Sequence, residues 1–444
     1  MWFITFRPDD RQLPLQNIGL PHLILNMHTM KLKRPATLLL TALPLGLAAQ
    51  DCSIPFTLPL FQVQVDSNVV YGSAVQYNGS TVELAMNIYK PVGDGQTERP
   101  LAVVVHGGGF YEGSRNEMND LCHGLASSGW AAATISYRLG FYGNGIVGPP
   151  YAYDPAEIHR AVYRAMQDAK GAVRFLKGRH EQDSTSTTNV FLVGFSAGAI
   201  TALQAGYMTA PAQKPDVCGA IGQVQHFFNF YPRPDLGDVD GSLNQNGHSA
   251  DILGVVSIFG AIADTSWITL DGPALYTYHQ TGDPIVACGH NRPYWGIGLG
   301  IPDNFPYLYG SCAIDVRMQH LGPAPGRYLF HPFSGNEHDL DDPAGILLEA
   351  SGWMRDLFCT TTTALPPDPV AGRFAVYPNP TNGLVHTDLR PGTFYTLQDA
   401  YGRTVRNGKF TGEPMDLGVL PDGVYWLQAD LPSGHYGLRL LKVD

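Results

Sequence analysis

Residues 190–200, VFLVGFSAGAI, place a serine between an apolar run and a row of small residues. The apolar run is typical of a buried strand, and the small residues after Ser196 are typical of the start of a helix. Glycines two positions before and after the serine match the pattern G-x-S-x-G, in which strand and helix pack closely around a strained turn and expose the hydroxyl. In a chain with 50 glycines such a short match arises by chance, so this feature alone leaves Ser196 as either a nucleophile or a turn residue.

Apolar strands alternate with helices on both sides of this motif. The predicted strands contain LAVVV, WAAATISY, VFLVG, ILGVVSIF, ALYTYHQ and GRYLFHPF. The predicted helices include residues 156–177, whose apolar positions recur on one face, and the stretch PAGILLEASGWMRDLF. This alternation predicts an α/β fold, with a mostly parallel sheet covered by helices on both faces. Functional side chains of such sheets lie just beyond the carboxyl ends of the strands.

The N-terminal part has the pattern of an export signal. From Met30 the sequence MKLKRPATLLLTALPLGLAAQDC has a basic start, a short apolar stretch and small residues. This predicts a signal peptide over residues 30–49, too short to span a membrane, and a secreted or cell-surface location. Residues 1–29 lack this logic, and we interpret them as an extension from a mis-assigned start codon. A lipoprotein is disfavoured because Cys52 does not directly follow the small residues.

A Thr/Pro-rich segment, residues 361–372, divides the chain. Such a composition cannot build a core, so we expect a linker between a catalytic domain over residues 50–360 and a smaller domain over residues 373–444. The smaller domain contains short strand patterns separated by Gly, Pro and Asn, which predicts a small all-β sandwich.

Composition excludes several classes of partner and cofactor. A net charge of -11 and the lack of a basic stripe argue against nucleic acid. No stretch after the signal is apolar enough to span a bilayer. The six cysteines of an exported chain predict at least one disulfide, with the pairing left open, and none forms a CxxC pair of the kind that binds zinc. The segment DVDGSLNQNG lacks the full spacing of a calcium loop, so neither a metal nor an organic cofactor is expected.

The motif HGGGF, residues 106–110, ends the strand LAVVV. Consecutive glycines let backbone N–H groups face a bound oxyanion without a Cβ in the way. We therefore expect the N–H groups of Gly108, Gly109 and Ala197 to form an oxyanion hole, the alternative being a flexible turn. His106 is expected to brace this loop and not to act as a base.

A serine nucleophile needs a general base, and that base needs an orienting carboxylate. His338 in GNEHDLDDP follows the last strand and precedes the closing helix, so it is the predicted base, whereas His331 lies in the strand and is predicted to be structural. Asp283 in HQTGDPIV follows a strand and completes the chain order Ser…Asp…His. Asp264 and Asp315 are its rivals, since a lone aspartate is more often a cap or a turn residue.

Together these motifs give a resemblance that covers roughly residues 80–358. The chain resembles an α/β-hydrolase of the HGGG-bearing carboxylesterase/lipase group, particularly the bacterial esterases that include feruloyl and acetylxylan esterases. The matching segments are HGGGF, SYRL, QDAKGAVRFLK, GFSAGA, GAIAD, HQTGDPIV, YGSCAI and EHDL. The resemblance implies that Asp168 and Arg174 are scaffold residues, as a structural ion pair. The sequence departs from the family where Gln280 replaces the usual glycine after His279, and where Glu-His-Asp replaces Gly-His-Gly.

The C-terminal segment resembles the sorting domain of the type IX secretion system of Bacteroidota. VYPNPTNG, DAYGRTV, LPDGVYWLQ and the terminal LLKVD occur in the expected order behind a linker. This implies that residues 373–444 engage the type IX secretion machinery. The alternative is a carbohydrate-binding or adhesive β-module, although its aromatic residues fit strand faces equally well.

These features predict a secreted serine carboxylesterase that acts through Ser196, Asp283 and His338. Its expected substrates are esterified polysaccharides or aryl esters. The alternatives are a serine peptidase of the same fold and a catalytically inactive surface binding protein. Two loops keep open roles. Residues 138–155 either wall the substrate pocket or form an ordinary crossover, and residues 207–250 form either a cap or an exposed excursion.

Overall fold

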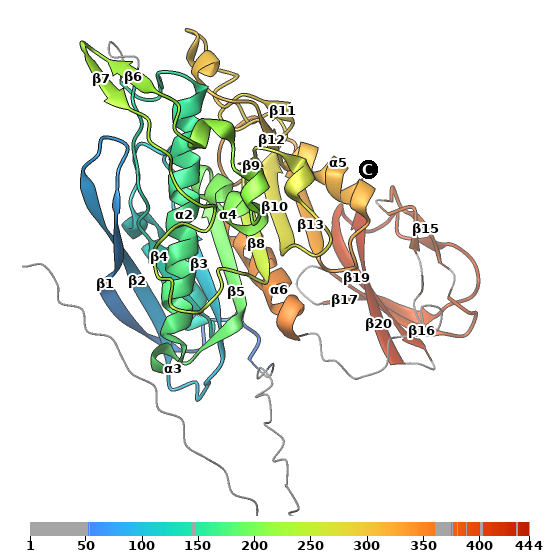
Figure 1. Ribbon diagram of the computed structural model, residues 1–444. Coiled ribbons are helices and arrows are strands. Elements are labelled where there is room, and N and C mark those ends of the chain that lie inside the picture. Colours follow the sequence, from blue (N-terminus) through green and yellow to red (C-terminus); the bar gives the residue numbers. More distant parts are fainter. Residues whose placement is uncertain are drawn as a thin grey trace, which may run out of the picture. The chain divides into compact units, whose positions relative to one another are not determined.

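The structure, a computed structural model shown in Figure 1, describes residues 52, 54–143, 148–359, 374, 376–379, 381–387, 389–399, 403–431 and 434–443. The predicted N-terminal extension, signal peptide and linker lie outside these residues and stay predictions, as do the predicted domain boundaries. Among the helices described, none combines the length and apolar character needed to cross a membrane.

An eight-stranded sheet runs through the α/β body, residues 54–359, in the order β1-β2-β4-β3-β5-β8-β10-β13. Its strands are β1 (Gln62–Val75), β2 (Thr81–Val92), β3 (Arg99–Val105), β4 (Ala131–Ile135), β5 (Thr185–Phe195), β8 (Gly254–Ile258), β10 (Ala274–Gln280) and β13 (Tyr328–Phe333). The β1–β2 and β2–β4 pairs are antiparallel, and the other neighbours are parallel. The expected mostly parallel sheet is thus confirmed.

Helices cover both faces of this sheet. Figure 1 shows α2 (Pro155–Gly178) and α4 (Ala197–Tyr207) in front of the strands and α6 (Pro343–Cys359) behind them. Alternate residues of β3 enter two different cores: Val103 packs in the core that contains α2 and α4, whereas Val104 packs in the core that contains α6 and α1 (Asn119–Ser127). The fold is therefore that of an α/β-hydrolase, with two apolar cores separated by one buried sheet. Two further α-helices of this part are α3 (His180–Asp183) and α5 (Ser311–Leu321).

The body also contains short strands outside the eight-stranded sheet. β6 (Gln223–His226) and β7 (Asn229–Pro232) form a hairpin that projects from it (Figure 1), and Phe228 at its turn is 95% exposed. The hairpin is therefore an exposed excursion, whereas other parts of the segment 207–250 contact the body, as where Gln167 of α2 donates to the Asp238 carbonyl. β9 (Ala261–Ile262), β11 (His290–Asn291) and β12 (Leu308–Gly310) form a second small sheet.

The C-terminal segment folds as two small antiparallel sheets, β14-β15-β18 and β17-β16-β19-β20. Its strands are β14 (Val376–Tyr377), β15 (Leu384–Thr387), β16 (Phe394–Asp399), β17 (Thr404–Lys409), β18 (Met415–Asp416), β19 (Gly423–Leu431) and β20 (Gly434–Lys442). One apolar cluster joins side chains from both sheets, including Val385, Leu397 and Leu427. The expected small all-β domain is thus present.

Two disulfides close parts of the body. Cys52 is bonded to Cys359 at the end of α6, and Cys288 is bonded to Cys312 at the start of α5. Cys122 and Cys218 are free and buried. The prediction of at least one disulfide is confirmed, and disulfides of this kind belong to an oxidising compartment.

Candidate active site

The turn between β5 and α4 holds Ser196 in a backbone conformation that few side chains adopt, with φ of 53°. Both glycines of the motif are required by close backbone approach: a Cβ on Gly194 would lie 2.2 Å from the carbonyl oxygen of Gly198, and one on Gly198 would lie 2.1 Å from that of Val105. The Ser196 N–H donates to the Ile258 carbonyl at 3.0 Å, which ties the turn to β8. The local sequence therefore folds into a strained turn with the serine at its apex.

Ser196, His338 and Asp283 are joined in one hydrogen-bonded chain. His338 Nε2 lies 2.8 Å from Ser196 Oγ, and His338 Nδ1 lies 2.6 Å from Asp283 Oδ2. Because an ionised carboxylate can only accept, Nδ1 carries the proton and Nε2 accepts from the serine hydroxyl. Phe259 packs on the imidazole, with ring centroids 4.5 Å apart. The structure thus brings together three residues that are separated by up to 142 positions in the chain.

Asp283 is fully buried yet well supplied with donors. Its Oδ1 accepts the N–H groups of Ile285 and Val286 at 2.8 and 3.0 Å, while Oδ2 faces His338 and His279. Burial raises the pKa of this carboxyl, but hydrogen bonds from His279 and His338 outweigh burial and hold the pKa below its ordinary value. Asp283 is therefore ionised at neutral pH and can stabilise an imidazolium at His338.

Gln280 clamps the loop that carries His338. Its Nε2 donates to the carbonyl of Asp339 at 2.9 Å, and its Oε1 accepts the N–H of Glu337 at 2.9 Å. Both contacts are made by one buried amide, on either side of the histidine. Gln280, which stands where the resemblance leads us to expect a glycine, therefore has a structural role that the sequence alone did not indicate.

The HGGGF loop lies against the serine, as the sequence predicts. His106 is buried and braces the loop: Nδ1 lies 2.7 Å from the Gly107 carbonyl oxygen and the ring stacks on Tyr137. Burial lowers the pKa of His106. Within the described part of the chain, no hydrogen bond uses the N–H groups of Gly108, Gly109 or Ala197 as donors, so they are available to an oxyanion.

A small hollow of about 30 Å³ opens beside the serine hydroxyl. Gly109, Ser196 and Ala197 line one side of it. The rest of the lining is mostly apolar and consists of Phe110, Ile158, Ile200, Ile285, Val286, Pro293, Tyr294, Phe305 and Leu308. The hollow thus presents an apolar surface next to the Ser196 hydroxyl.

The wall of the hollow is mainly the segment 285–308, which no pattern in the sequence had indicated. None of the described residues among 138–155 lines it, so the expectation that this loop walls the pocket is wrong for those residues. Instead Tyr142 packs on Tyr77 and stacks on Tyr231, away from the serine. Two cysteines 24 residues apart, Cys288 and Cys312, bracket most of the missed segment and were the available signal.

A second serine–histidine contact lies nearby. His279 Nδ1 is 2.9 Å from Ser311 Oγ, and His279 Nε2 is 2.7 Å from the Val286 carbonyl oxygen. Both side chains are fully buried, so a substrate carbonyl has no access to this hydroxyl. The pair supports Asp283 from behind and cannot replace Ser196.

The rival residues have other partners. Asp264 caps the short helix Thr265–Trp267 by accepting the Ser266 N–H at 2.7 Å, and Asp315 accepts from Gln319 and Tyr328. His331 lies in β13 and pairs with Glu349. These contacts explain each residue without a role at Ser196.

The expected ion pair between Asp168 and Arg174 is wrong. Asp168 is fully buried and pairs with Arg138, whose Nε lies 2.9 Å from both carboxylate oxygens. Arg174 instead donates to the carbonyl oxygens of Asp240 and Leu243. Two residues six apart on one helix point in different directions, so they do not meet.

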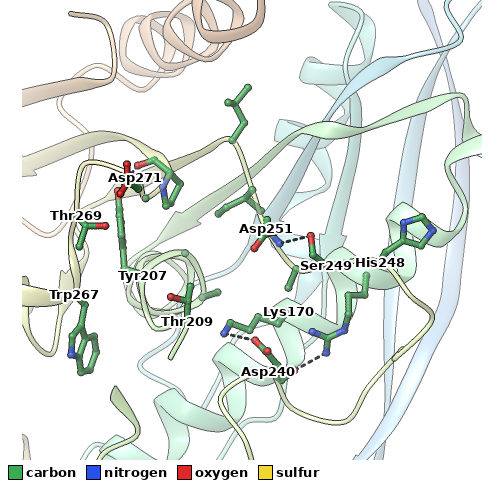
Figure 2. Close-up of a pocket in the computed structure, with 18 of the residues that line it drawn as sticks. Lys170, Tyr207, Thr209, Asp240, His248, Ser249, Asp251, Trp267, Thr269 and Asp271 are labelled. Carbon is green, nitrogen blue, oxygen red and sulfur yellow. Dashed lines mark hydrogen bonds and ion pairs between the residues drawn. The ribbon is translucent and has the colours of Figure 1, made fainter. Parts of the chain in front are cut away.

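A cavity of about 630 Å³ lies away from this site (Figure 2). Leu253 and Pro273 line it, and they precede β8 and β10, so it lies at the amino ends of the strands. Figure 2 shows His248 turned away from Ser249, whose hydroxyl accepts the Asp251 N–H at 3.4 Å. No described residue of this cavity forms a serine–histidine hydrogen bond.

The chain is similar to several known proteins. Residues 86–292 match the model of the family described as BD-FAE. A neuroligin-like protein, glit-1 of Caenorhabditis elegans, is 35% identical over 118 residues, which are 26% of this chain and 15% of that protein. The chain thus aligns with only 15% of the length of that relative.

Solved esterase structures also resemble the body. A truncated carbohydrate esterase from gut microbiota has a TM-score of 0.43 at 14% identity, covering 68% of this chain and 98% of that one. The apo form of Thermogutta terrifontis esterase 2 has a TM-score of 0.41 at 17% identity, covering 70% and 97% of the two chains.

Proposed function

We propose that this chain is an esterase of the BD-FAE family, whose model matches residues 86–292, and that Ser196, His338 and Asp283 carry out its reaction. The observation that carries this assignment is the continuous hydrogen-bonded chain from Ser196 through His338 to the buried carboxylate of Asp283. The function is that of a secreted carboxylic ester hydrolase that forms an acyl-enzyme.

In the first half of the reaction, His338 Nε2 takes the proton from Ser196 while Oγ attacks the ester carbonyl. The negative charge of the tetrahedral intermediate falls on the former carbonyl oxygen, which accepts the N–H groups of Gly109 and Ala197, with Gly108 as a third donor. Asp283 stabilises the imidazolium without taking its proton. Collapse of the intermediate breaks the bond to the alcohol, and His338 returns the proton to that leaving oxygen.

In the second half, water replaces the alcohol. His338 takes a proton from the water as its oxygen attacks the acyl-enzyme carbonyl, and the same N–H groups hold the oxyanion. The carboxylic acid leaves, and Ser196 regains its proton from His338.

The hollow beside Ser196 selects a short acyl group. A water molecule needs roughly 10–15 Å³ of such space, so the hollow of about 30 Å³ holds only a few heavy atoms. An acetyl group meets this limit, whereas a feruloyl group exceeds it. Phe305→Ala, which widens the hollow, is expected to raise the ratio of butyrate to acetate ester turnover about tenfold; Tyr307→Ala, two residues on and 53% exposed, is the control.

We assign the alcohol part to a polysaccharide. Trp295 donates its indole N–H to the Asp283 carbonyl at 2.7 Å, which fixes the indole beside the triad, and the side chain is 44% exposed. An exposed aromatic face beside a catalytic group provides a stacking surface for a sugar ring. The leaving alcohol is then a sugar hydroxyl.

Residues 373–444 are proposed to be a type IX secretion sorting domain. Their sequence motifs support this, together with the small antiparallel sheets that they form. In a Bacteroidota host, a chain ending at residue 372 is expected to remain in the periplasm, while the full chain reaches the surface or the medium. Export of the shortened chain would contradict this assignment.

The reaction itself is tested by comparing Ser196→Ala with Ser311→Ala on p-nitrophenyl acetate. Loss of the nucleophile is expected to lower kcat by about 10⁴-fold or more, whereas Ser311→Ala should retain most of the activity because Ser311 is buried away from substrate. Equal activity of Ser196→Ala and the unmodified chain would refute the mechanism.

A further inference from the structure

Four arginines surround a second hollow of about 180 Å³ on the body. Its lining includes Arg138, Arg160, Arg164 and Arg233. Arg138 follows the carboxyl end of β4, so the hollow lies toward the same edge of the sheet as Ser196, which follows parallel β5. Tyr77 and Tyr142 supply aromatic lining.

Two of these arginines are neutralised by carboxylates. Arg138 pairs with Asp168. Arg233 Nη2 lies 2.9 Å from Asp154 Oδ2. Arg233 Nε lies 2.9 Å from Glu157 Oε1, and this second contact is an ion pair without a hydrogen bond. The charges of these two guanidinium groups are therefore balanced by carboxylates of the protein.

The other two have no carboxylate partner among the described residues. Arg160 donates to the carbonyl oxygens of Val217, Gly219 and Pro234. Arg164 donates to the Gly140 carbonyl oxygen at 2.9 Å. Two buried cations of one hollow are thus held by neutral acceptors, and neither is in direct contact with a carboxylate among the described residues.

Arg164 carries an unused donor. Only 2% of this residue is exposed, and its buried Nε has no hydrogen-bond partner within the described structure. Burial, and then the neighbouring Arg138, lower the pKa of Arg164 to about 10. A buried guanidinium with an unmet donor is costly unless an acceptor reaches it, and a carboxylate suits guanidinium geometry.

We propose that this hollow binds the carboxylate of an acidic sugar, with Arg164 and Arg160 as its cationic partners. The hollow is larger than a bare carboxylate needs, at about 180 Å³. Glu157 and Asp235 also line it, and carboxylates accept from sugar hydroxyls while repelling a dianion such as phosphate more strongly than a monoanionic uronate. The tyrosine rings offer faces to the sugar ring. A uronate unit has a carboxylate for the arginines, hydroxyl groups for Glu157 and Asp235, and a ring face for the tyrosines.

The site is connected to the oxyanion loop. Arg164 holds the carbonyl of Gly140, and the Gly140 N–H donates to the Phe110 carbonyl at 2.7 Å. Phe110 directly follows Gly109, a proposed oxyanion donor. An acidic unit of the polymer would therefore be bound on the segment that also supports the loop beside Ser196.

Binding can be measured without turnover, so its failure and that of the proposed reaction are separable. Full-length chain carrying Ser196→Ala is titrated calorimetrically with sodium glucuronate, glucose, sodium acetate and sodium phosphate at constant ionic strength. We expect saturable glucuronate binding and at least tenfold weaker binding of the other three. The proposal would be overturned if glucuronate did not bind. It would also be overturned if glucose, acetate or phosphate bound as tightly as glucuronate.

Arg164→Met and Arg160→Met, each in the Ser196→Ala background, are expected to weaken glucuronate binding tenfold or more. Arg355→Met is the control, because Arg355 lies in α6 and contacts Asp356 outside this hollow. Circular dichroism shows which variants fold. Unchanged glucuronate binding in either folded arginine variant would contradict the assignment of these residues. If neither variant folds, the comparison of the four ligands on the Ser196→Ala chain tests the proposal.

Discussion

His338 Nδ1 lies 2.6 Å from Asp283 Oδ2, and that short contact sets which nitrogen of the imidazole faces Ser196. Because Asp283 can only accept, the proton stays on Nδ1, and Nε2 is free to take the serine proton. The opposite oxygen of Asp283 is held by two backbone N–H groups, so the carboxylate cannot rotate away.

Asp283→Asn is expected to lower kcat about 10⁴-fold with folding retained, because an amide nitrogen near Nδ1 favours the wrong tautomer. Steady-state kinetics on p-nitrophenyl acetate measure this. Asp264→Asn is the matched control, since Asp264 only caps a short helix, and it should change kcat less than twofold. Similar losses in the two variants would contradict the assignment of Asp283.

Asp283 also predicts a pH dependence of stability. Its folded pKa lies below the unfolded value of 3.8, so its ionisation stabilises the fold above that value, and this contribution is lost as the pH falls through the folded pKa. Urea unfolding between pH 6 and pH 3 should therefore show a steeper loss of stability in the native chain than in Asp283→Asn. Parallel curves would show that the pKa of Asp283 is not lowered by folding.

Gln280→Leu tests the clamp on the loop of His338. Losing both hydrogen bonds should displace the imidazole and lower kcat about tenfold to a hundredfold, with little change in KM because Gln280 does not line the hollow. The control is Gln319→Leu on the exposed face of α5. A change confined to KM would mean that Gln280 acts on substrate binding and not on the base.

Gly140→Ala tests the support of the oxyanion loop. Gly140 has φ of 97°, and an added Cβ would lie 2.2 Å from the ring of Tyr77, so its N–H must move from the Phe110 carbonyl. We expect kcat to fall about tenfold, less than the 10²–10³-fold loss that follows removal of an oxyanion donor. Gly148→Ala, in open space in the same loop, should be silent.

The sequence predicted the catalytic candidates best, because their residue types and their order along the chain both matched a serine hydrolase. The motif around Ser196, the HGGGF loop, and the aspartate and histidine after successive strands predicted which side chains the sheet brings together. The fold followed from apolar strands that alternate with helices, since such strands require a covered parallel sheet.

Features that depend on tertiary packing were not predictable in the same way. The pairing of Asp168 with Arg138 joins α2 to a loop 30 residues earlier, and no helical spacing indicates it. The hollow is walled by residues 285–308, an irregular segment without periodicity, and the expectation had placed the loop 138–155 there. Gln280 could be noted as a departure, but its clamp on both sides of His338 needs the fold to be seen.

Labelling with a fluorophosphonate followed by peptide mapping tests the central assignment most directly, because the reagent reacts with a serine that is activated by a neighbouring base. We expect one adduct per chain, on Ser196, and none on the Ser311 peptide. We also expect loss of labelling in His338→Ala. An adduct on Ser311, or undiminished labelling of Ser196→Ala, would contradict the assignment of Ser196 as the nucleophile.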